Sequence, residues 1–248
     1  VKTFSVPFAL EELKKNIAIT INTPSNSSKE QIINQAFQFH SQGNISEAAK
    51  CYQYFIDQGF NDQRVWSNYG VILQNKGKLQ EAEISFRKAI ELTPDFANAH
   101  SNLGNILRDL DKLEEAEIST RKAIELNPDF AQAHSNLGNI LIDLGKLEEA
   151  ELSIRKAIAL NPNFTNAHLN LGGILRKMCK LEAAEISTRK AIELKPNFPE
   201  AYTNLGDILR DSGKLEESKE AYQKSLEIDP EQIHLISKII YTLSRLCM

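Results

Sequence analysis

The chain has 248 residues, a hydrophobic fraction of 42% and a formal net charge of −4, which are ordinary values for a folded protein in water. The acidic balance argues against a nucleic-acid partner, because general nucleic-acid-binding proteins usually carry a basic surface. Three cysteines, Cys51, Cys179 and Cys247, are too few and too irregularly spaced for a disulfide framework or a zinc site, so we expect no metal and a reducing, cytoplasmic location.

Residues 1–28 precede a repeated pattern and are predicted to form an N-terminal arm and a flexible linker. Residues 8–15 have the spacing of a short helix, and residues 22–28 (NTPSNSS) have the polar composition of a linker. The aliphatic run at residues 17–21 is too short to span a bilayer, so we predict no membrane partner.

From residue 29 onward the sequence repeats every 34 residues. The register is set by five prolines, each of which follows a helical pattern and ends it because proline has no N–H: Pro94, Pro128, Pro162, Pro196 and Pro230. This register predicts a degenerate first repeat and then five full ones, at residues 29–62, 63–96, 97–130, 131–164, 165–198 and 199–232.

Each full repeat contains two helical stretches. The first carries a glycine at position 8, although a glycine inside a helix costs about 1 kcal/mol relative to alanine. We therefore infer a close approach of the second helix, which has small alanines such as Ala116 and Ala123. The turn between the helices holds Gly77, Gly145 and Gly213, where positive φ is often required, and Asp111 and Cys179 take the same place in the other two full repeats.

The residues at key positions of the repeat resemble the signature of the tetratricopeptide repeat family, which has the same period. In the second repeat these residues are Trp66, Tyr69, Gly70, Leu73, Ala82, Phe86, Ala89 and Pro94. The resemblance implies an all-α fold, a right-handed α-α superhelix or solenoid of stacked helix-turn-helix units. It also implies that the first helix of each pair lines an inner groove. Thr120, Thr188, Ser218 and Ser225 depart from the pattern and are expected to loosen the packing locally.

Residues 233–248 are predicted to form a divergent capping helix. Six aliphatic residues would give this helix an apolar outer face: Ile233, Ile236, Ile239, Ile240, Leu243 and Leu246. A good cap of a repeat array has a polar outer face. We therefore expect this helix to pack against something else, with self-association through it among the alternatives, or the chain to be part of a longer protein.

One asparagine recurs at position 6 of every repeat, and we call this set the asparagine row: Asn34, Asn68, Asn102, Asn136, Asn170 and Asn204. Asparagine is a poor helix former, so its presence even in the two least similar repeats favours a function. A carboxamide both donates and accepts hydrogen bonds, and it suits the backbone of an extended peptide. The alternative is that the row merely reflects copying of one repeat.

The predicted peptide-binding groove contains the asparagine row together with Asn105, Asn139, Arg108, Arg176 and Arg210. The phrases around Asn102, Asn136, Asn170 and Asn204, such as AHSNL and AYTNL, resemble repeats of O-linked N-acetylglucosamine transferase, and Asn34 and Asn68 share their register. That resemblance implies binding of a substrate's backbone. Position 2 lacks the lysine of the carboxylate clamp found in some family members, so recognition of a C-terminal carboxylate is not expected.

Two further sets of residues recur at fixed positions of the repeat, and neither is interpreted as a binding site. His100, His134 and His168 recur at position 4, but equivalent helices are about 8–10 Å apart, too far for two nitrogens to share a metal. We expect these histidines to replace a packing aromatic. Four Arg-Lys pairs each follow a glutamate by four residues, as Arg121 follows Glu117, which is typical of a solvated helix face rather than a phosphate site.

The sequence contains no nucleophile–base pair, phosphate-binding glycine loop or metal-spaced ligand set, so we predict no catalysis and no cofactor. The first interpretation is a protein-protein interaction scaffold that binds an extended segment of a protein or peptide partner in the inner groove. The alternative is the substrate-recruiting arm of a larger, glycosyltransferase-like enzyme whose catalytic domain is not part of this chain.

Overall fold

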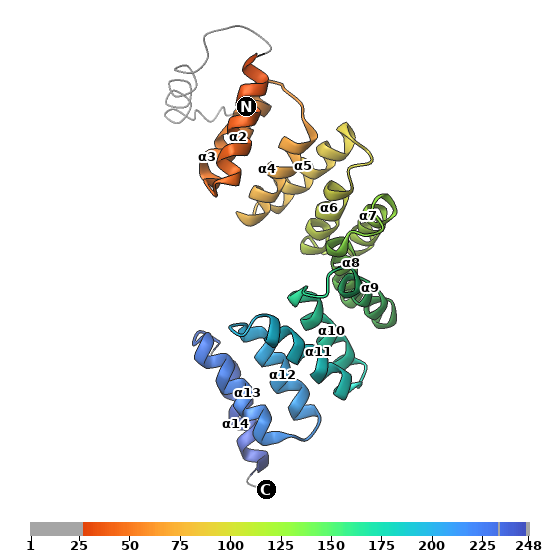
Figure 1. Ribbon diagram of the computed structural model, residues 1–248, viewed down its shortest axis with the longest axis vertical. Helices are drawn as coiled ribbons and strands as arrows, with labels where there is room; N and C mark the ends of the chain where they lie inside the picture. Colours follow the sequence, from red (N-terminus) through yellow and green to blue (C-terminus); the bar gives the residue numbers. More distant parts are fainter. Residues whose placement is uncertain (1–26, 233, 247–248) are drawn as a thin grey trace, which may run out of the picture. The chain divides into compact units, whose positions relative to one another are not determined.

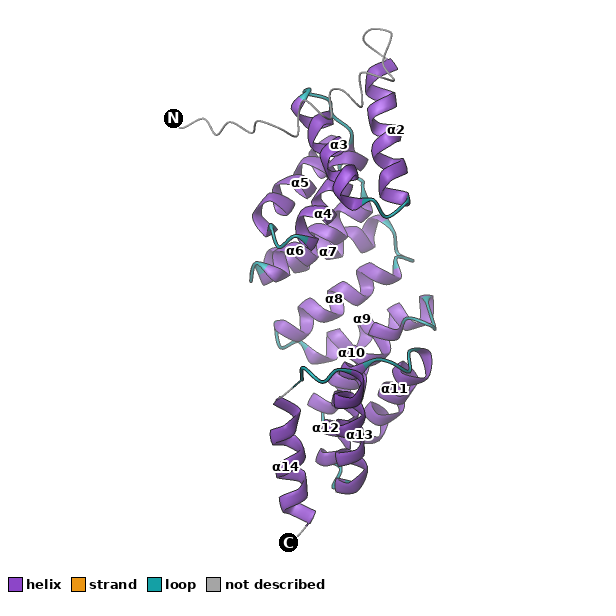
Figure 2. Cartoon of the chain, turned by 90° about the vertical axis from the view of Figure 1, so that its left-hand side faces the viewer, coloured by secondary structure: helices purple, strands orange, loops and turns teal. Residues whose placement is uncertain are grey.

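A computed structural model describes residues 27–232 and 234–246, and all the elements in this part of the chain are α-helices. Figure 1 shows the helices in chain order, and Figure 2 shows helices and loops but no strand over the same residues. The all-α solenoid of helix pairs is therefore confirmed. The expected helix at residues 8–15 and Ile233 lie outside the described residues.

The helices divide into two compact units after Pro94. The first unit contains α2 (Ser27–Ser41), α3 (Ile45–Asp57), α4 (Gln63–Asn75) and α5 (Leu79–Leu92). The second unit contains α6 (Ala97–Asp109), α7 (Leu113–Leu126), α8 (Ala131–Asp143), α9 (Leu147–Leu160), α10 (Thr165–Lys177), α11 (Leu181–Leu194), α12 (Pro199–Asp211), α13 (Leu215–Ile228) and α14 (His234–Leu246).

Within the second unit the helices stack in a regular order. The first helices of the repeats, α6, α8, α10 and α12, contact one another in sequence. The second helices, α7, α9, α11 and α13, each pack between the first helix of their own repeat and the helix that follows. The core runs through this stack and includes Leu137, Leu141, Ile154, Leu171 and Ile174. Each repeat thus has a first-helix side and a second-helix side.

The helical glycines lie where the two helices of a repeat approach most closely, as predicted. A Cβ added at Gly104 would lie 2.0 Å from Thr120 Oγ1, and one added at Gly138 would lie 2.5 Å from Ile154 Cδ1. Thr120 is fully buried against Gly104, and its equivalent Thr188 is fully buried against Gly172. Among the described residues, Thr120 Oγ1 is the buried side-chain polar atom without a hydrogen-bond partner, so the departure from the repeat pattern leaves a local defect here.

The turns between paired helices require positive φ, also as predicted. Gly145 and Gly213 have φ of 75° and 77°, and Asp111 and Cys179 adopt φ of 60° and 57° at the same place. A side chain in this left-handed region costs free energy because its Cβ crowds the following carbonyl. Two of the five such turns in the full repeats are therefore strained relative to the others.

We expect Cys179→Gly to raise the free energy of unfolding by about 0.5–1 kcal/mol, because relief of the left-handed strain exceeds the added entropy of the unfolded chain. Thermal unfolding followed by circular dichroism measures the change. The reverse substitution, Gly145→Cys, is the matched control and should lower the midpoint by a similar amount. An unchanged or lower midpoint for Cys179→Gly would contradict the strain argument.

The last helix, α14, packs against α13. Leu235 and Thr242 are fully buried, whereas Ile236, Ile240 and Tyr241 are 47%, 61% and 54% exposed. The apolar surface of this helix is thus only partly covered by the last repeat. None of the helices in the described part of the chain has the length and apolar character needed to cross a membrane.

Candidate functional site

The asparagine row lies on the first helices of the repeats. In the second unit, Asn102, Asn136, Asn170 and Asn204 lie on α6, α8, α10 and α12, on the side where these helices contact one another. Asn136 is buried, with 8% of its surface exposed, and the other three are half-buried. In the first unit, Asn68 on α4 is half-buried and Asn34 on α2 is exposed.

The amide nitrogens of this row connect adjacent repeats. Asn136 Nδ2 donates to Ser101 Oγ at 3.1 Å, and Asn170 Nδ2 donates to Asn139 Oδ1 at 2.7 Å. Asn204 Nδ2 lies 3.4 Å from the Leu169 carbonyl oxygen, and in the first unit Asn68 Nδ2 donates to the Tyr52 hydroxyl at 3.3 Å. Every one of these partners belongs to the preceding repeat. The row therefore has a stacking role, which sequence analysis did not anticipate.

Several polar atoms of the same surface have no protein partner. Over the part of the chain that the structure describes, Asn102 and Asn105 make no side-chain hydrogen bond, and the amide oxygens of Asn170 and Asn204 accept none. The orientation of the Asn170 and Asn204 carboxamides is set by their bonded nitrogens. The first-helix side therefore presents the amide oxygens of Asn170 and Asn204 as fixed acceptors, together with the complete carboxamides of Asn102 and Asn105.

Two of the three predicted arginines pair with aspartates of the following repeat, and the third, Arg210, pairs with Asp207 and Asp211 of its own repeat. Arg108 Nε donates to Asp143 Oδ2 at 2.5 Å, and Arg176 Nε donates to Asp211 Oδ2 at 2.6 Å. Both members of each pair are about one-third exposed. These pairs neutralise the arginines, so the surface offers no unpaired positive charge at these two positions for a carboxylate ligand.

The most connected polar residue of this surface is Asp207 on α12, which sequence analysis missed. Tyr222 donates to Asp207 Oδ1 at 2.6 Å, and Lys238 Nζ from α14 lies 2.8 and 2.9 Å from its two oxygens. Arg176 and Arg210 each approach the carboxylate to 3.3 Å. Burial opposes the ionisation of Asp207, but the Lys238 ammonium and the Tyr222 hydroxyl outweigh it and lower the pKa.

A sequence signal for Asp207 existed. Position 9 holds Asn105, Asn139 and Gly173 in the three preceding repeats, so Asp207 is a single acid where the pattern is neutral. Its partner Lys238 lies in the divergent last helix, 31 residues further on. The three cations and the hydroxyl around it tie α14 to the last full repeat.

His134 and His168, at position 4, donate hydrogen bonds to the turns that precede their helices. His134 Nε2 lies 2.9 Å from the Pro128 carbonyl oxygen, and His168 Nε2 lies 2.9 Å from that of Pro162. Over residues 27–232 and 234–246, no group of three or more His, Cys, Asp and Glu side chains could hold a metal ion. Each of these two histidines therefore anchors the turn that precedes its own helix.

The Arg-Lys pairs on the second helices are part of exposed ion-pair networks. Arg121 pairs with Glu117 at 2.8 Å, and Lys146 of the next repeat reaches the same glutamate at 2.7 Å. The Lys146 ammonium, outweighing burial, lowers the pKa of Glu117. The same triad recurs around Glu151 and Glu185. The predicted solvated helix face is thus confirmed, and the bridge to the next repeat adds to it.

Two cysteines lie in the described part of the chain, and one of them, Cys51, is buried in the first unit. Burial, and to a smaller extent the Glu47 carboxylate, raises the pKa of the Cys51 thiol to about 11. At neutral pH this thiol is protonated, and a thiol is a far weaker nucleophile than a thiolate. Cys51 is therefore suited to packing rather than to chemistry.

Three family models match the chain between residues 70 and 232. One described as "Tetratricopeptide repeat" matches residues 97–130 and 131–164, a second with the same description matches residues 165–198 and 199–232, and one described as "TPR repeat" matches residues 70–111. The matches begin and end at the repeat boundaries set by the prolines in the four later repeats. A comparison with curated proteins finds no match.

Solved structures with the same fold include YrrB, described as a TPR protein with an unusual peptide-binding site. It is 24% identical, with a TM-score of 0.59 over 77% of this chain and 98% of its own. TTC0263 from Thermus thermophilus, a thermophilic TPR protein, is 22% identical, with a TM-score of 0.63 over 73% of this chain and 99% of its own. A chain of the APC/C hetero-tetramer Cut9-Hcn1 is 16% identical, with a TM-score of 0.78 over 87% of this chain and 43% of its own.

Proposed function

Because the chain belongs to the tetratricopeptide repeat family, we propose that it is a non-catalytic protein-interaction scaffold that binds an extended peptide segment of a partner on its first-helix side. The observation that carries this proposal is the set of carboxamide atoms on that side without protein partners. An extended peptide presents alternating N–H and C=O groups that such atoms recognise independently of the peptide's sequence.

The spacing of the second unit supports binding of the backbone. Equivalent helices lie about 10 Å apart, and an extended peptide advances about 3.3 Å per residue. One carboxamide of the asparagine row would therefore meet the peptide backbone at about every third residue. Asn102 and Asn105 would both donate and accept, while Asn170 and Asn204 would accept through oxygens already held in place.

The charge of this side supports a ligand without a dominant charge. Arg108 and Arg176 are each neutralised by an aspartate of the next repeat. An approaching segment would meet neutral carboxamides and balanced ion pairs rather than a charged clamp. YrrB, which shares the fold at 24% identity, is described as having a peptide-binding site, and this description agrees with a peptide as the class of ligand.

The alternative, a substrate-recruiting arm of a larger glycosyltransferase-like enzyme, uses the same peptide-binding side. It differs in requiring a catalytic domain in the same gene product. An open reading frame that continues past Met248 into a catalytic domain would identify that alternative, and a stop codon there would favour the scaffold.

We expect the double variant Asn102→Ala, Asn105→Ala to bind peptides about fivefold to a hundredfold more weakly than the wild type, because two neutral hydrogen bonds are lost. The probes are peptides selected from a random display library on the full chain, with affinity measured by fluorescence polarisation. The loss should be similar for peptides of different sequence, since the contacts are to backbone. Stability should be unchanged or higher, since alanine is the better helix former.

Asn197→Ala provides the matched control, because Asn197 is an exposed asparagine in the turn before α12, away from this row. It should bind the selected peptides with wild-type affinity. Wild-type affinity of the double variant as well, with its fold intact, would show that the first-helix carboxamides serve stacking alone.

A further inference from the structure

The second-helix side of the array exposes a row of large apolar side chains. Position 22 places Ile118 on α7, Leu152 on α9 and Ile186 on α11, with 70%, 69% and 72% of their surfaces exposed. Ile84 on α5 in the first unit has the same position and is 65% exposed. In the second unit, three exposed aliphatic residues thus lie at the same position of consecutive second helices, and we call them the apolar row.

Grooves lie beside this row, between successive second helices. The groove between α9 and α11 has a volume of about 730 Å³, and its lining includes Ile158, Leu171, Leu175 and Ile186. The equivalent groove between α7 and α9 has a volume of about 450 Å³ and is lined by Ile124, Leu137 and Leu152 among others. The two grooves have the same floor, because a leucine of the intervening first helix lies under each.

The larger groove owes its character to two departures from the repeat. Ala159 stands at position 29, where four other repeats have glutamate, and Ala183 stands at position 19, where all five other repeats have glutamate. Both alanines line the groove between α9 and α11. Copying of a repeat predicts glutamate at both places. Two acids are therefore replaced by small apolar residues on one groove.

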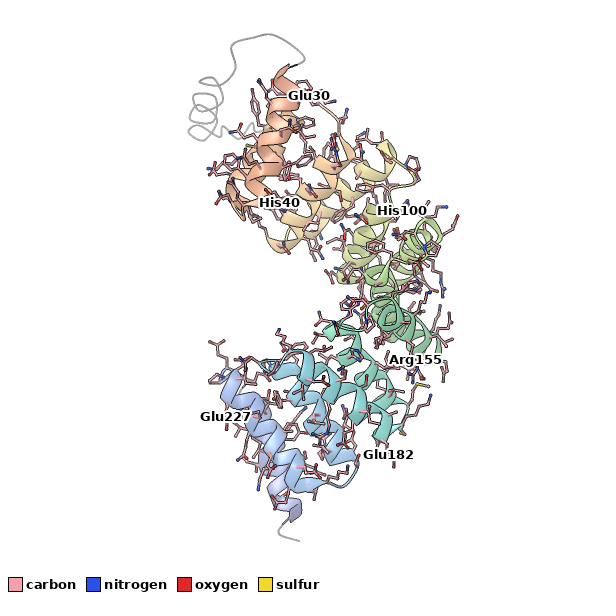
Figure 3. The ribbon with its side chains drawn as sticks, in the orientation of Figure 1. Glu30, His40, His100, Arg155, Glu182 and Glu227 are labelled. Carbon is pink, nitrogen blue, oxygen red and sulfur yellow. The ribbon has the colours of Figure 1, made fainter. Side chains whose placement is uncertain are left out.

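The charges around the apolar row change sign along each helix. On α9, Glu148 and Glu149 precede Leu152 by four and three residues, while Arg155 and Lys156 follow it by three and four. Residues three or four apart share a helix face, so Ile118 and Leu152 each have two acids on one side and two bases on the other, and Ile186 has one acid and two bases. Figure 3 labels a basic and an acidic member of this pattern, Arg155 on α9 and Glu182 on α11.

We propose that the second-helix side of α7, α9 and α11 is a self-association surface on which a second copy of the chain docks in antiparallel orientation. A two-fold axis beside Leu152 would bring the acids of one copy opposite the bases of the other. A parallel arrangement would oppose like charges instead. The pattern is self-complementary when the two-fold axis is perpendicular to the helices, and two-fold symmetry is the commonest symmetry of protein dimers.

The two copies meet helix on helix under this symmetry. The axis lies across the helices and along the stack, so each second helix faces its equivalent in the other copy, and the aliphatic side chains of the two rows meet beside the grooves. The groove widened by Ala159 and Ala183 has space for such side chains. This surface is separate from the first-helix side, so a dimer would leave both copies able to bind peptide.

The test restores glutamate, the residue of the repeat pattern, at positions 159 and 183. The variant Ala159→Glu, Ala183→Glu is expected to raise the dimer dissociation constant at least about a hundredfold, because two charged carboxylates would be desolvated in an apolar interface. Sedimentation equilibrium over a range of concentrations measures the mass. The control Asn98→Glu, Asn166→Glu adds the same charge on the first-helix side, where Glu200 is the equivalent of both residues, and should leave the dimer unchanged.

A second arm tests the orientation. Glu148→Lys, Glu149→Lys and Arg155→Glu, Lys156→Glu should each be monomeric alone, and a mixture of the two variants should form a heterodimer detectable by native mass spectrometry. If a groove variant fails to fold, Leu152→Gln replaces it, since Leu152 is largely exposed.

Three results would overturn the proposal. The first is a wild-type chain that stays monomeric at high concentration, which would assign this surface to a different protein. The second is a dimer that survives the groove variant. The third is a dimer lost only when Ile236 and Ile240 of α14 are changed to lysine, which would place self-association at the last helix.

Discussion

Gly172→Ala is expected to lower the free energy of unfolding by about 2–3 kcal/mol, whereas Gly173→Ala is expected to raise it by up to about 1 kcal/mol. A Cβ at Gly172 would lie 2.1 Å from Thr188 Oγ1 and 3.3 Å from the Ala184 carbonyl oxygen. A Cβ at Gly173 would meet nothing within 4 Å. Two adjacent glycines of one helix should thus respond to the same substitution with opposite signs.

The opposite signs separate packing from helix propensity. Propensity alone favours alanine at both positions, so only the approach of α11 makes Gly172→Ala destabilising. Denaturant unfolding, with amide exchange to locate the change in α10 and α11, gives the measurement. The double variant Gly172→Ala, Thr188→Ala removes the clash and should recover part of the loss. Stabilisation by Gly172→Ala alone would refute the close approach.

Asp207→Ala is expected to lower the free energy of unfolding by about 2–3 kcal/mol, less than a fully buried ion pair would lose because its cations are partly exposed. The substitution leaves Lys238, Arg176 and Arg210 without their shared carboxylate and Tyr222 without its acceptor. The loss should appear first in α14, because Lys238 connects that helix to α12. Amide exchange of residues 234–246 measures the loosening.

The same carboxylate predicts a pH dependence. A lowered pKa in the folded protein means that Asp207 contributes stability fully at pH values above its unfolded pKa of about 3.9. This contribution is lost as the pH falls through the lowered folded pKa. The pKa values of Glu117, Glu151 and Glu185 are also lowered in the folded protein. The contribution of Asp207 is therefore measured as the difference in the free energy of unfolding between the wild type and Asp207→Asn.

Asp207→Asn is the matched variant, since asparagine occupies this position in two other repeats. It keeps an acceptor for Tyr222 and removes only the charge. The difference in stability between the wild type and Asp207→Asn should therefore shrink on acidification below about pH 4. A difference that stays constant down to low pH would show that the charge of Asp207 contributes nothing to stability. Packing alone would then hold α14 against the last full repeat.

The sequence by itself determined the features that recur within one repeat. The 34-residue register, the two helices of each unit, the glycine contacts at Gly104 and Gly138 and the positive φ at Asp111 and Cys179 were all predicted. Each depends on local backbone requirements or on a contact between the two helices of a single hairpin. Such contacts span few residues, and their repetition along the chain makes the pattern visible.

Only the tertiary structure decided how neighbouring repeats use their polar side chains. The sequence placed Asn170 and Arg108 on a groove but did not predict that the asparagine donates to Asn139 or that the arginine pairs with Asp143. Those partners lie 31 and 35 residues away, and the choice among several polar neighbours depends on how one helix pair rotates on the next. The widened groove beside Ala159 and Ala183 has the same origin, because two residues from different repeats face one space only after the helices stack.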